Sequence, residues 1–376
     1  MQRVAIIQRV LPHYRIQFFD DLYEGLAANG VALTVYYGRE FPGTVPKTTP
    51  VTAAWGKEIC NRYWSLAGRD IVWQRVPSEV WEADMIVVEQ AARFPLNFRL
   101  QARRLYRAKK LAFWGHGRNY QAHNARGLTE AIKRMLIRGV DWWFAYTDLS
   151  AREVAAAGFP RERITIVNNT IDSEGLRAAM ARVTPAQSEW VRVQQGLIGT
   201  AVGVYCGGMY ADKRLPFLID AIKRIKARVP DFEMIFIGDG PDAPLVKHAA
   251  ESLPWVRYLG PLYDDARAVY LSIAKIMLMP GLVGLAVIDA FVADTPLATT
   301  AIDFHSPEIA YLKHGVNGLI SADGIDHYAD MVVNYFADSA GAEILVSGCR
   351  QAAAELTLTT MVANFSQGVM ACLGRS

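Results

Sequence analysis

Short apolar segments alternate with amphipathic ones along most of the chain, and this alternation constrains the fold more than any other feature. Near the start, the apolar run 3–8 precedes an amphipathic stretch at 14–28. A second series of the same kind starts at 202–206, followed by a helix-like stretch at 215–228. Strands that alternate with helices predict parallel sheets covered by helices on both faces. We therefore expect an α/β protein with two doubly wound, Rossmann-like domains.

The length of 376 residues also favours two domains, because a single hydrophobic core rarely grows so large. The polar stretch 182–195 separates the two series and predicts the boundary. We assign the first domain to residues 1–180 and the second to 181–355. A closing helix at about 356–376 could pack back on the first domain.

Composition excludes several classes of protein. The apolar fraction of 52% is that of an ordinary globular chain, and the four cysteines form no CxxC pair. A structural zinc site or a disulfide framework is therefore not expected, and a reducing cytoplasm suits the chain. No segment reads as a signal peptide or a membrane span. We expect a cytoplasmic protein, either soluble or resting on a membrane.

A glycine-rich loop with two cations joins the first strand and helix of the second series. It reads Gly207-Gly208-Met209-Tyr210-Ala211-Asp212-Lys213-Arg214. Glycines let the backbone approach a ligand, and a helix N-terminus offers free N–H groups to an anion. Lys213 and Arg214 are unfavourable at this end of a helix unless an anion compensates them. The loop predicts a phosphate site, although a solvated basic pair after an ordinary turn fits the residues equally well.

Two more loops follow later strands of the same series. Gly238-Asp239-Gly240-Pro241 is a common turn, but it would end on the same sheet edge as the first loop. The segment 280–291 places two glycines before an apolar helix that contains Asp289. A carboxylate in such a helix needs a partner, and either a ribose diol or an internal hydrogen bond would serve.

The order of these motifs resembles glycosyltransferase family 4, whose members are retaining enzymes of the GT-B fold. The similarity extends over nearly the whole chain. The segments that carry it are the three loops above together with Ile166–Asp172, Tyr258-Leu259-Gly260, Ser306-Pro307-Glu308-Ile309 and Gly315–Leu319. It implies two Rossmann-like domains that face each other across a cleft, the first for the acceptor and the second for a nucleotide-sugar donor.

The resemblance also implies roles for individual residues. Lys213 would hold the donor diphosphate, helped by Arg214, while Asp289 would bind the ribose and His116 would approach the transferred sugar. The catalytic residues would be His116 and Lys213. The remaining donor-binding residues would be Gly207, Gly208, Gly238, Asp239, Gly240, Leu259, Pro261, Leu262, Gly281, Leu282, Val283, Gly284 and Leu285. Acceptor-binding residues would be Pro12, His13 and Arg15, with His13 equally well read as a helix-start residue.

Three positions depart from the family pattern. The family has a glutamate, seven residues and a second glutamate, where this chain has Gly281 and Asp289. The arginine that usually lies five positions before the phosphate lysine is Gly208 here. The glycine pair of the first domain is replaced by Val10–Arg15. The donor sugar and the acceptor contacts are therefore open.

The stretch 99–138 has eleven basic residues against Glu130 alone, interleaved with apolar ones. This pattern suits the anionic inner face of the plasma membrane, and a solvated helix face explains it nearly as well. No nucleic-acid-binding motif accompanies the charge. The expected partners are a nucleotide-sugar donor and a glycan or polyprenyl-linked acceptor, without a metal or another cofactor.

We thus expect hexosyl transfer in cell-surface polysaccharide synthesis. A nucleotide-sugar epimerase of the same fold is the main alternative, and Gly281 in place of a glutamate argues against it. An NAD(P) oxidoreductase would need a third glycine after Gly207-Gly208. A non-enzymatic membrane-binding module would leave the second half of the chain unexplained.

Overall fold

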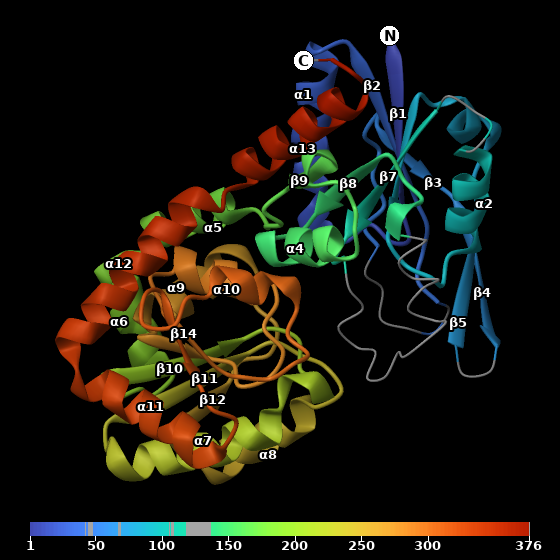
Figure 1. Ribbon diagram of the computed structural model, residues 1–376. Coiled ribbons are helices and arrows are strands. Elements are labelled where there is room, and N and C mark those ends of the chain that lie inside the picture. The colour runs from blue at the N-terminus through green and yellow to red at the C-terminus, as the bar shows by residue number, and fades with distance from the viewer. Residues whose placement is uncertain are drawn as a thin grey trace. The chain divides into compact units, whose positions relative to one another are not determined.

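The computed structural model describes residues 1–41, 43, 48–66, 69–104, 106, 109–117 and 137–375. Contacts divide the chain into two compact units, one formed by Met1–Ile171 with Leu358–Ser376 and the other by Asp172–Thr357 (Figure 1). The division follows Ile171, whereas the sequence prediction placed it after residue 180.

The first unit contains a seven-stranded sheet in the order β3-β2-β1-β6-β7-β8-β9. Every neighbouring pair in it is parallel. The strands are β1 (Gln2–Gln8), β2 (Val31–Tyr37), β3 (Gly56–Glu58), β6 (Met85–Glu89), β7 (Lys110–Gly115), β8 (Trp142–Ala145) and β9 (Ile164–Ile166). A separate antiparallel pair is formed by β4 (Cys60–Leu66) and β5 (Arg69–Arg75).

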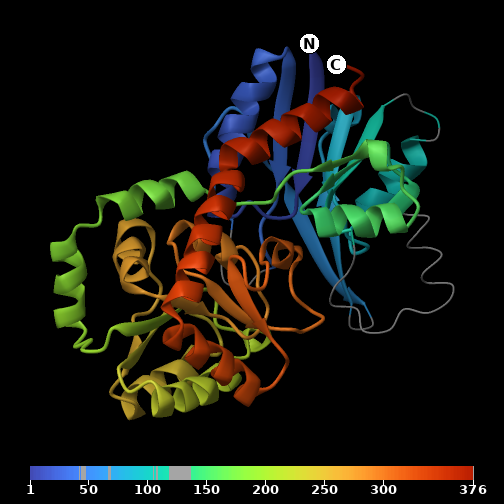
Figure 2. The same ribbon diagram turned by 60° about the vertical axis from the view of Figure 1, so that its left-hand side comes forward.

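Helices cover both faces of this sheet. One face packs on α1 (Ile16–Ala28) and α13 (Leu358–Cys372), around a buried core in which the rings of Phe144 and Phe365 stack at 4.1 Å. The other face packs on α2 (Pro95–Arg104) and α4 (Asp148–Ala156). Figure 2 shows α13 running along the first unit although it comes from the end of the chain.

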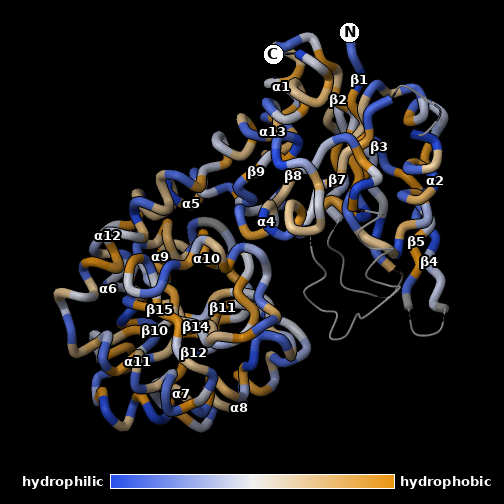
Figure 3. Tube along the Cα trace, viewed as in Figure 1, coloured by the Kyte–Doolittle hydropathy of each residue, from blue (hydrophilic) through white to orange (hydrophobic). Residues whose placement is uncertain are grey.

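The second unit contains a six-stranded sheet in the order β12-β11-β10-β13-β14-β15, again parallel throughout. Its strands are β10 (Ala201–Cys206), β11 (Phe232–Ile237), β12 (Val256–Tyr258), β13 (Ile276–Leu278), β14 (Leu297–Thr300) and β15 (Gly318–Ser321). Its helices are α5 (Ser173–Arg182), α6 (Pro185–Gln194), α7 (Leu215–Arg228), α8 (Ala243–Ser252), α9 (Asp264–Ile273), α10 (Ala286–Val292), α11 (Ile325–Ala337) and α12 (Ser339–Glu355). Apolar residues follow the strands of the sheet in Figure 3.

The prediction of two doubly wound α/β domains is confirmed, and local differences have physical causes. The polar stretch 182–195 is a helix, α6, because Thr184 and Gln187 form a capping box with Pro185 in the first turn. The β4–β5 hairpin was not predicted, because its strands mix arginines with aromatic residues. Residues 118–136 of the basic stretch 99–138 lie outside the described residues. Among the described residues, no helix is long and apolar enough to cross a membrane.

Candidate functional site

The order of strands in the second unit places a switch point between β10 and β13. The chain runs from β10 to β11 and β12 on one side, and from β13 to β14 and β15 on the other. Ligands of open parallel sheets bind at such a point, outside the carboxyl ends of the strands. The loops that start at Gly207 and Met279 both begin there, which brings two of the predicted glycine loops to one place.

The glycines of the first two loops make room for one another. A Cβ on Gly238 would lie 1.9 Å from the carbonyl oxygen of Gly207, and one on Gly240 would lie 2.2 Å from that of Met209. The Met209 amide donates to the Asp239 carbonyl at 2.8 Å. Only glycine permits this backbone packing, so the loop conformations are fixed before any ligand binds.

The loop that follows β12 is hydrogen-bonded to the loop that follows β11. The Gly238 amide donates to the carbonyl of Gly260 at 2.9 Å, and the Leu259 amide donates to Phe236 at 3.0 Å. Leu259 and Leu262 are half-buried, and Pro261 is exposed. The predicted pocket residues after β11 and β12 therefore lie in one hydrogen-bonded layer.

Lys213 ends a 3-10 turn, Ala211–Lys213, just before α7, and only 5% of the residue is exposed. Its Nζ donates to the Leu282 carbonyl at 2.5 Å and lies 3.8 Å from the sulfur of Met279. Burial lowers the pKa of Lys213 to about 8, although Asp212 and Glu308 oppose the shift. Among the described residues, no carboxylate lies within ion-pair distance of this ammonium group. An anion at this position would stabilise its charge.

Arg214 has a different environment. It adopts a left-handed conformation with φ 56°, and its guanidinium pairs with Asp323 at 2.7 Å. The same nitrogen donates to the Thr300 hydroxyl at 3.2 Å, and the group stacks over Phe217. The charge of Arg214 is thus partly compensated within the unit, so Lys213 is the stronger candidate for the diphosphate.

The loop after β13 is tied to the Lys213 turn. The amide of Leu282 donates to the Asp212 carbonyl at 2.8 Å. A Cβ on Gly281 would lie 2.3 Å from the same oxygen. The amide of Leu282, a predicted donor-binding residue, is therefore bonded within the protein. The Val283 amide is also bonded, to a side chain that the sequence reasoning missed.

That side chain is His305. Its Nδ1 accepts from the Val283 amide at 3.1 Å, and its Nε2 donates to the Thr300 carbonyl at 2.8 Å. These two bonds require the neutral Nε2–H tautomer. Burial lowers the pKa of His305, which keeps it neutral. His305 directly precedes Ser306-Pro307-Glu308, a segment that carries the family resemblance, and this position could have indicated a role for it. A lone histidine outside the glycine loops gave no other reason to select it.

Asp289 lies in α10 and is 6% exposed. Its Oδ2 accepts from Arg267 Nη1 of α9 at 2.8 Å, and this internal partner was also missed. Burial raises the pKa of Asp289, while the charge and hydrogen bond of Arg267 oppose the shift. Its other oxygen, Oδ1, is buried without a hydrogen-bond partner among the described residues. Sequence reasoning identified the carboxylate, but spacing does not reveal a partner 22 residues away.

In the first unit, His116 follows β7 and its ring lies 4.5 Å from that of Tyr146. Although His116 is exposed, desolvation by nearby protein and the charge of Arg15 lower the pKa of its imidazole, which is neutral at pH 7. Pro12 forms a β-bridge with Thr48, and His13 is exposed.

Arg15, which was predicted to bind the acceptor, is 5% exposed. Its guanidinium donates to the side chain of Asn169 and to the Thr170 carbonyl at 3.4 Å, and it lies 5.3 Å from the ring of Trp114. Groups of the protein therefore bind this guanidinium, and its role toward an acceptor stays a prediction.

The basic stretch 99–138 is described only in part. Arg99 and Arg103 stack over Trp81, at 4.6 and 4.9 Å from the ring centre. Arg104 pairs with Asp141 at 2.8 Å, and Lys109 pairs with Asp84 at 2.8 Å. Residues 105, 107–108 and 118–136 lie outside the described part. The four described side chains named above, Arg99, Arg103, Arg104 and Lys109, are thus bound to groups of their own unit.

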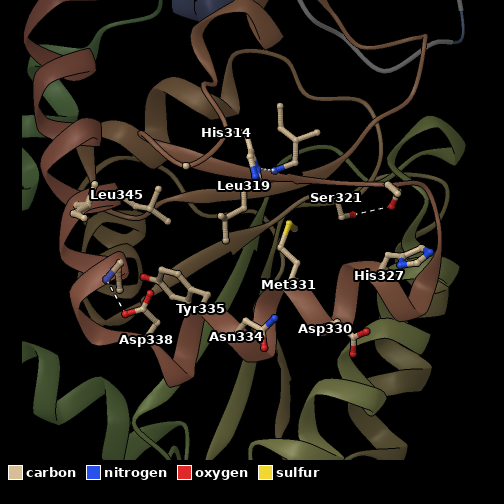
Figure 4. Close-up of a pocket in the computed structure, with 16 residues that line it drawn as sticks. His314, Leu319, Ser321, His327, Asp330, Met331, Asn334, Tyr335, Asp338 and Leu345 are labelled. Carbon is tan, nitrogen blue, oxygen red and sulfur yellow. Dashed lines mark hydrogen bonds between the residues drawn. The ribbon is translucent and has the colours of Figure 1, made fainter.

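A cavity of about 560 Å³ lies elsewhere in the second unit, among β15, α11 and α12 (Figure 4). Leu319, Met331 and Tyr335 line it, together with the rim residues His314 and His327. None of the predicted donor residues contributes to it. Among the described residues, no group of three or more His, Cys, Asp or Glu side chains could hold a metal ion.

Comparisons with known proteins agree with this geometry. Residues 200–338 match the family described as glycosyl transferases group 1. No curated protein sequence matches significantly. HepE from Anabaena, solved in complex with UDP, has a TM-score of 0.70 at 14% identity, with 99% of this chain and 100% of that chain covered.

Two further structures show the same fold. A glycosyltransferase from Rickettsia africae has a TM-score of 0.70 at 12% identity, with both chains covered completely. The lipopolysaccharide outer core galactosyltransferase WaaB has a TM-score of 0.64 at 13% identity, with 98% and 99% covered. With a group 1 glycosyl transferase match over residues 200–338 and the GT-B fold over its whole length, the protein is a glycosyltransferase.

Proposed function

We propose that the protein moves a hexose from a nucleotide diphosphate sugar to a glycan or lipid-linked acceptor, with retention at the anomeric carbon. The observation that carries this proposal is the buried ammonium of Lys213 at the switch point of the second sheet. It lies against fixed backbone loops and has no carboxylate partner among the described residues. A donor diphosphate would supply the missing negative charge.

The donor is proposed to be a uridine diphosphate sugar. Structures similar to this chain were solved with UDP and with UDP-glucose. Asp289 Oδ1, which has no partner among the described residues, would accept a hydrogen bond from a ribose hydroxyl that reached it. The loops after β11 and β12 would line the pocket around the nucleotide.

In the proposed reaction, the bond between the anomeric carbon and the diphosphate oxygen breaks as the acceptor oxygen bonds to the same face. Negative charge grows on the leaving diphosphate, and Lys213 would stabilise it there. The leaving phosphate would take the acceptor proton, so no enzymatic nucleophile and no metal are proposed. His116, neutral at pH 7, is the proposed contact with the transferred sugar.

The first unit is the proposed acceptor domain. A polyprenyl-linked acceptor and a place in cell-surface polysaccharide synthesis would locate the protein in the cytoplasm, on the inner face of the plasma membrane.

A thermal-shift panel of UDP-, GDP- and dTDP-sugars tests the donor proposal. We expect UDP-sugars to raise the melting temperature of the wild type. Lys213→Ala should weaken donor binding about 10- to 100-fold, because a charge-assisted hydrogen bond contributes about 1.5–3 kcal/mol. Lys223→Ala, on the exposed side of α7, is the matched control. The absence of any shift, or equal affinity of Lys213→Ala, contradicts the proposal.

The same preparation separates transfer from epimerisation. Proton NMR of the donor incubated without an acceptor should show no new sugar epimer. With an acceptor, the anomeric coupling constant of the product should match that of the donor. Conversion of the donor alone would favour the epimerase, and an inverted product would refute retention.

A further inference from the structure

The β4–β5 hairpin forms a two-stranded sheet of its own in the first unit (Figure 1). Its register pairs Arg62 with Trp73 and Trp64 with Ile71. Directly paired residues of an antiparallel ladder lie on the same face, and neighbours along each strand alternate between faces. The outer face, as we define it, therefore consists of Cys60, Arg62, Trp64, Ile71, Trp73 and Arg75.

The opposite face is attached to the unit. Val72 is 1% exposed, and its amide donates to the Arg93 carbonyl at 2.9 Å. Gln74 is 5% exposed and donates to the Gln8 carbonyl at 3.3 Å. The Tyr63 hydroxyl donates to the Arg39 carbonyl at 2.6 Å. These contacts fix which face of the hairpin is turned to solvent.

The outer face combines exposed aromatic rings with unpaired cations. Trp64 is 50% exposed and Trp73 is 39% exposed. Arg62 and Arg75 are exposed, and neither guanidinium has an ion pair or hydrogen bond within the described part of the chain. The register places Asp70 opposite Ser65, on the inner face. Two indoles and two free cations thus share a surface to which the register assigns no carboxylate.

We propose that the outer face of the hairpin binds an anionic membrane surface. Tryptophan favours the boundary between hydrocarbon and headgroups, where its apolar ring and polar N–H are both satisfied. Arginine pairs with lipid phosphates and is attracted by the negative surface potential. The register places these four side chains on one face of the ribbon, so they can meet the surface together.

A carbohydrate is the other partner that exposed tryptophans could bind. Sugar hydroxyls need acceptors as well as donors beside the stacking ring, and these come from carboxylates, amides and hydroxyls. The outer face has none of these groups among the six residues that define it. Its chemistry is cationic and apolar, which matches a lipid surface better than a glycan.

This inference adds a named contact surface to the proposed membrane location and does not depend on the donor site. It also relocates the expected contact, because the described basic residues of α2 are bound to Trp81, Asp141 and neighbouring groups. The thermal shift that UDP-sugars cause in the outer-face variants separates membrane binding from donor binding. Outer-face variants should keep the wild-type shift with UDP-sugars.

Vesicle flotation tests the proposal, with vesicles of phosphatidylethanolamine and phosphatidylglycerol compared with pure phosphatidylcholine. We expect the wild type to float with the anionic vesicles and to be released by high salt. Arg62→Gln/Arg75→Gln should lower the partition coefficient about 30-fold, since each charge near the headgroups contributes about 1 kcal/mol. Trp64→Ser/Trp73→Ser should also lose binding, through the loss of its interfacial rings.

Matched controls come from the same chain. Trp190 is 62% exposed on α6, and Trp190→Ser should float like the wild type. Arg161→Gln/Arg163→Gln removes two exposed arginines of the first unit outside the hairpin. Equal flotation of the wild type and both outer-face variants overturns the proposal, as does a wild type that does not bind anionic vesicles. A soluble glycan whose NMR contacts map to Trp64 and Trp73, without vesicle binding, would assign the face to sugar.

Discussion

Lys213 and Asp289 are among the ionisable side chains of the second unit that are almost completely removed from water, and their charges have different partners. Asp289 has a cationic partner inside the protein, the guanidinium of Arg267 at 2.8 Å. In the described part of the chain, Lys213 has a carbonyl, a thioether and the Tyr210 ring near its ammonium group, and no carboxylate within ion-pair distance. Burial therefore lowers the pKa of Lys213 to about 8, and an incoming anion would restore it. The unpaired cation is the residue that predicts a ligand.

Arg267→Leu should destabilise the second unit by about 3–5 kcal/mol, because it leaves the Asp289 carboxylate buried without a partner. Urea unfolding measures the change. The double variant Arg267→Leu/Asp289→Leu should recover much of the loss. Arg182→Leu, which breaks an exposed pair with Asp265, should cost at most about 1 kcal/mol. Equal effects of Arg267→Leu and Arg182→Leu would show that the buried pair is energetically unimportant.

At the scale of elements, the strand–loop–helix units are the part of the site that sequence predicts best. Glycines after apolar strands identified all three loops, because only glycine tolerates such close backbone contact. The sequence did not show why glycine is needed at these positions. Gly238 and Gly281 make room for neighbouring loops that are distant in sequence. His305 and Arg267 were missed for the same reason: each acts through a partner that only the fold brings near.

The hairpin shows a second limit of sequence reasoning. Strands are recognised from apolar runs or from polar and apolar alternation. In β4 and β5 the face turned to solvent contains tryptophan and arginine, so neither pattern is present. A strand whose outward face serves an interaction departs from the pattern that predicts strands.

Gly281→Ala should disrupt the donor loops, because its Cβ would lie 2.3 Å from the Asp212 carbonyl oxygen. We expect a loss of UDP-sugar binding, measured by thermal shift, together with lower stability of the second unit. Gly25→Ala, in α1 of the first unit, is the control, since its Cβ would make ordinary contacts with Ser366 at 3.6 Å and Val362 at 4.0 Å. Donor affinity that falls equally in both variants would argue against the proposed clash.

At the scale of the molecule, the end of the chain completes the unit that its beginning forms. Helix α13 places Met361, Phe365 and Val369 in the core of the first unit beside α1. Sequence analysis identified the helix but could not assign it to a unit. Helix–sheet packing between residues so far apart leaves no local signal.

Phe365→Ala should lower the stability of the first unit by about 3–5 kcal/mol, because it removes the ring stacked on Phe144 and leaves a cavity. Calorimetry should show the transition of the first unit shifting down, while UDP-sugars still stabilise the second. Gln367→Ala, at an exposed position of the same helix, should leave both transitions unchanged. A loss of donor binding in Phe365→Ala would mean that the units do not behave independently.

The placement of α13 also orders events during synthesis. The ribosome makes residues 1–171 first, yet the part of one sheet face that α13 covers stays exposed until residues 358–372 have emerged. The second unit, 172–357, is complete before then. The second unit can therefore fold on a nascent chain whose first half still exposes apolar surface. A chaperone that protects apolar surface would be needed longest by the half that is translated first.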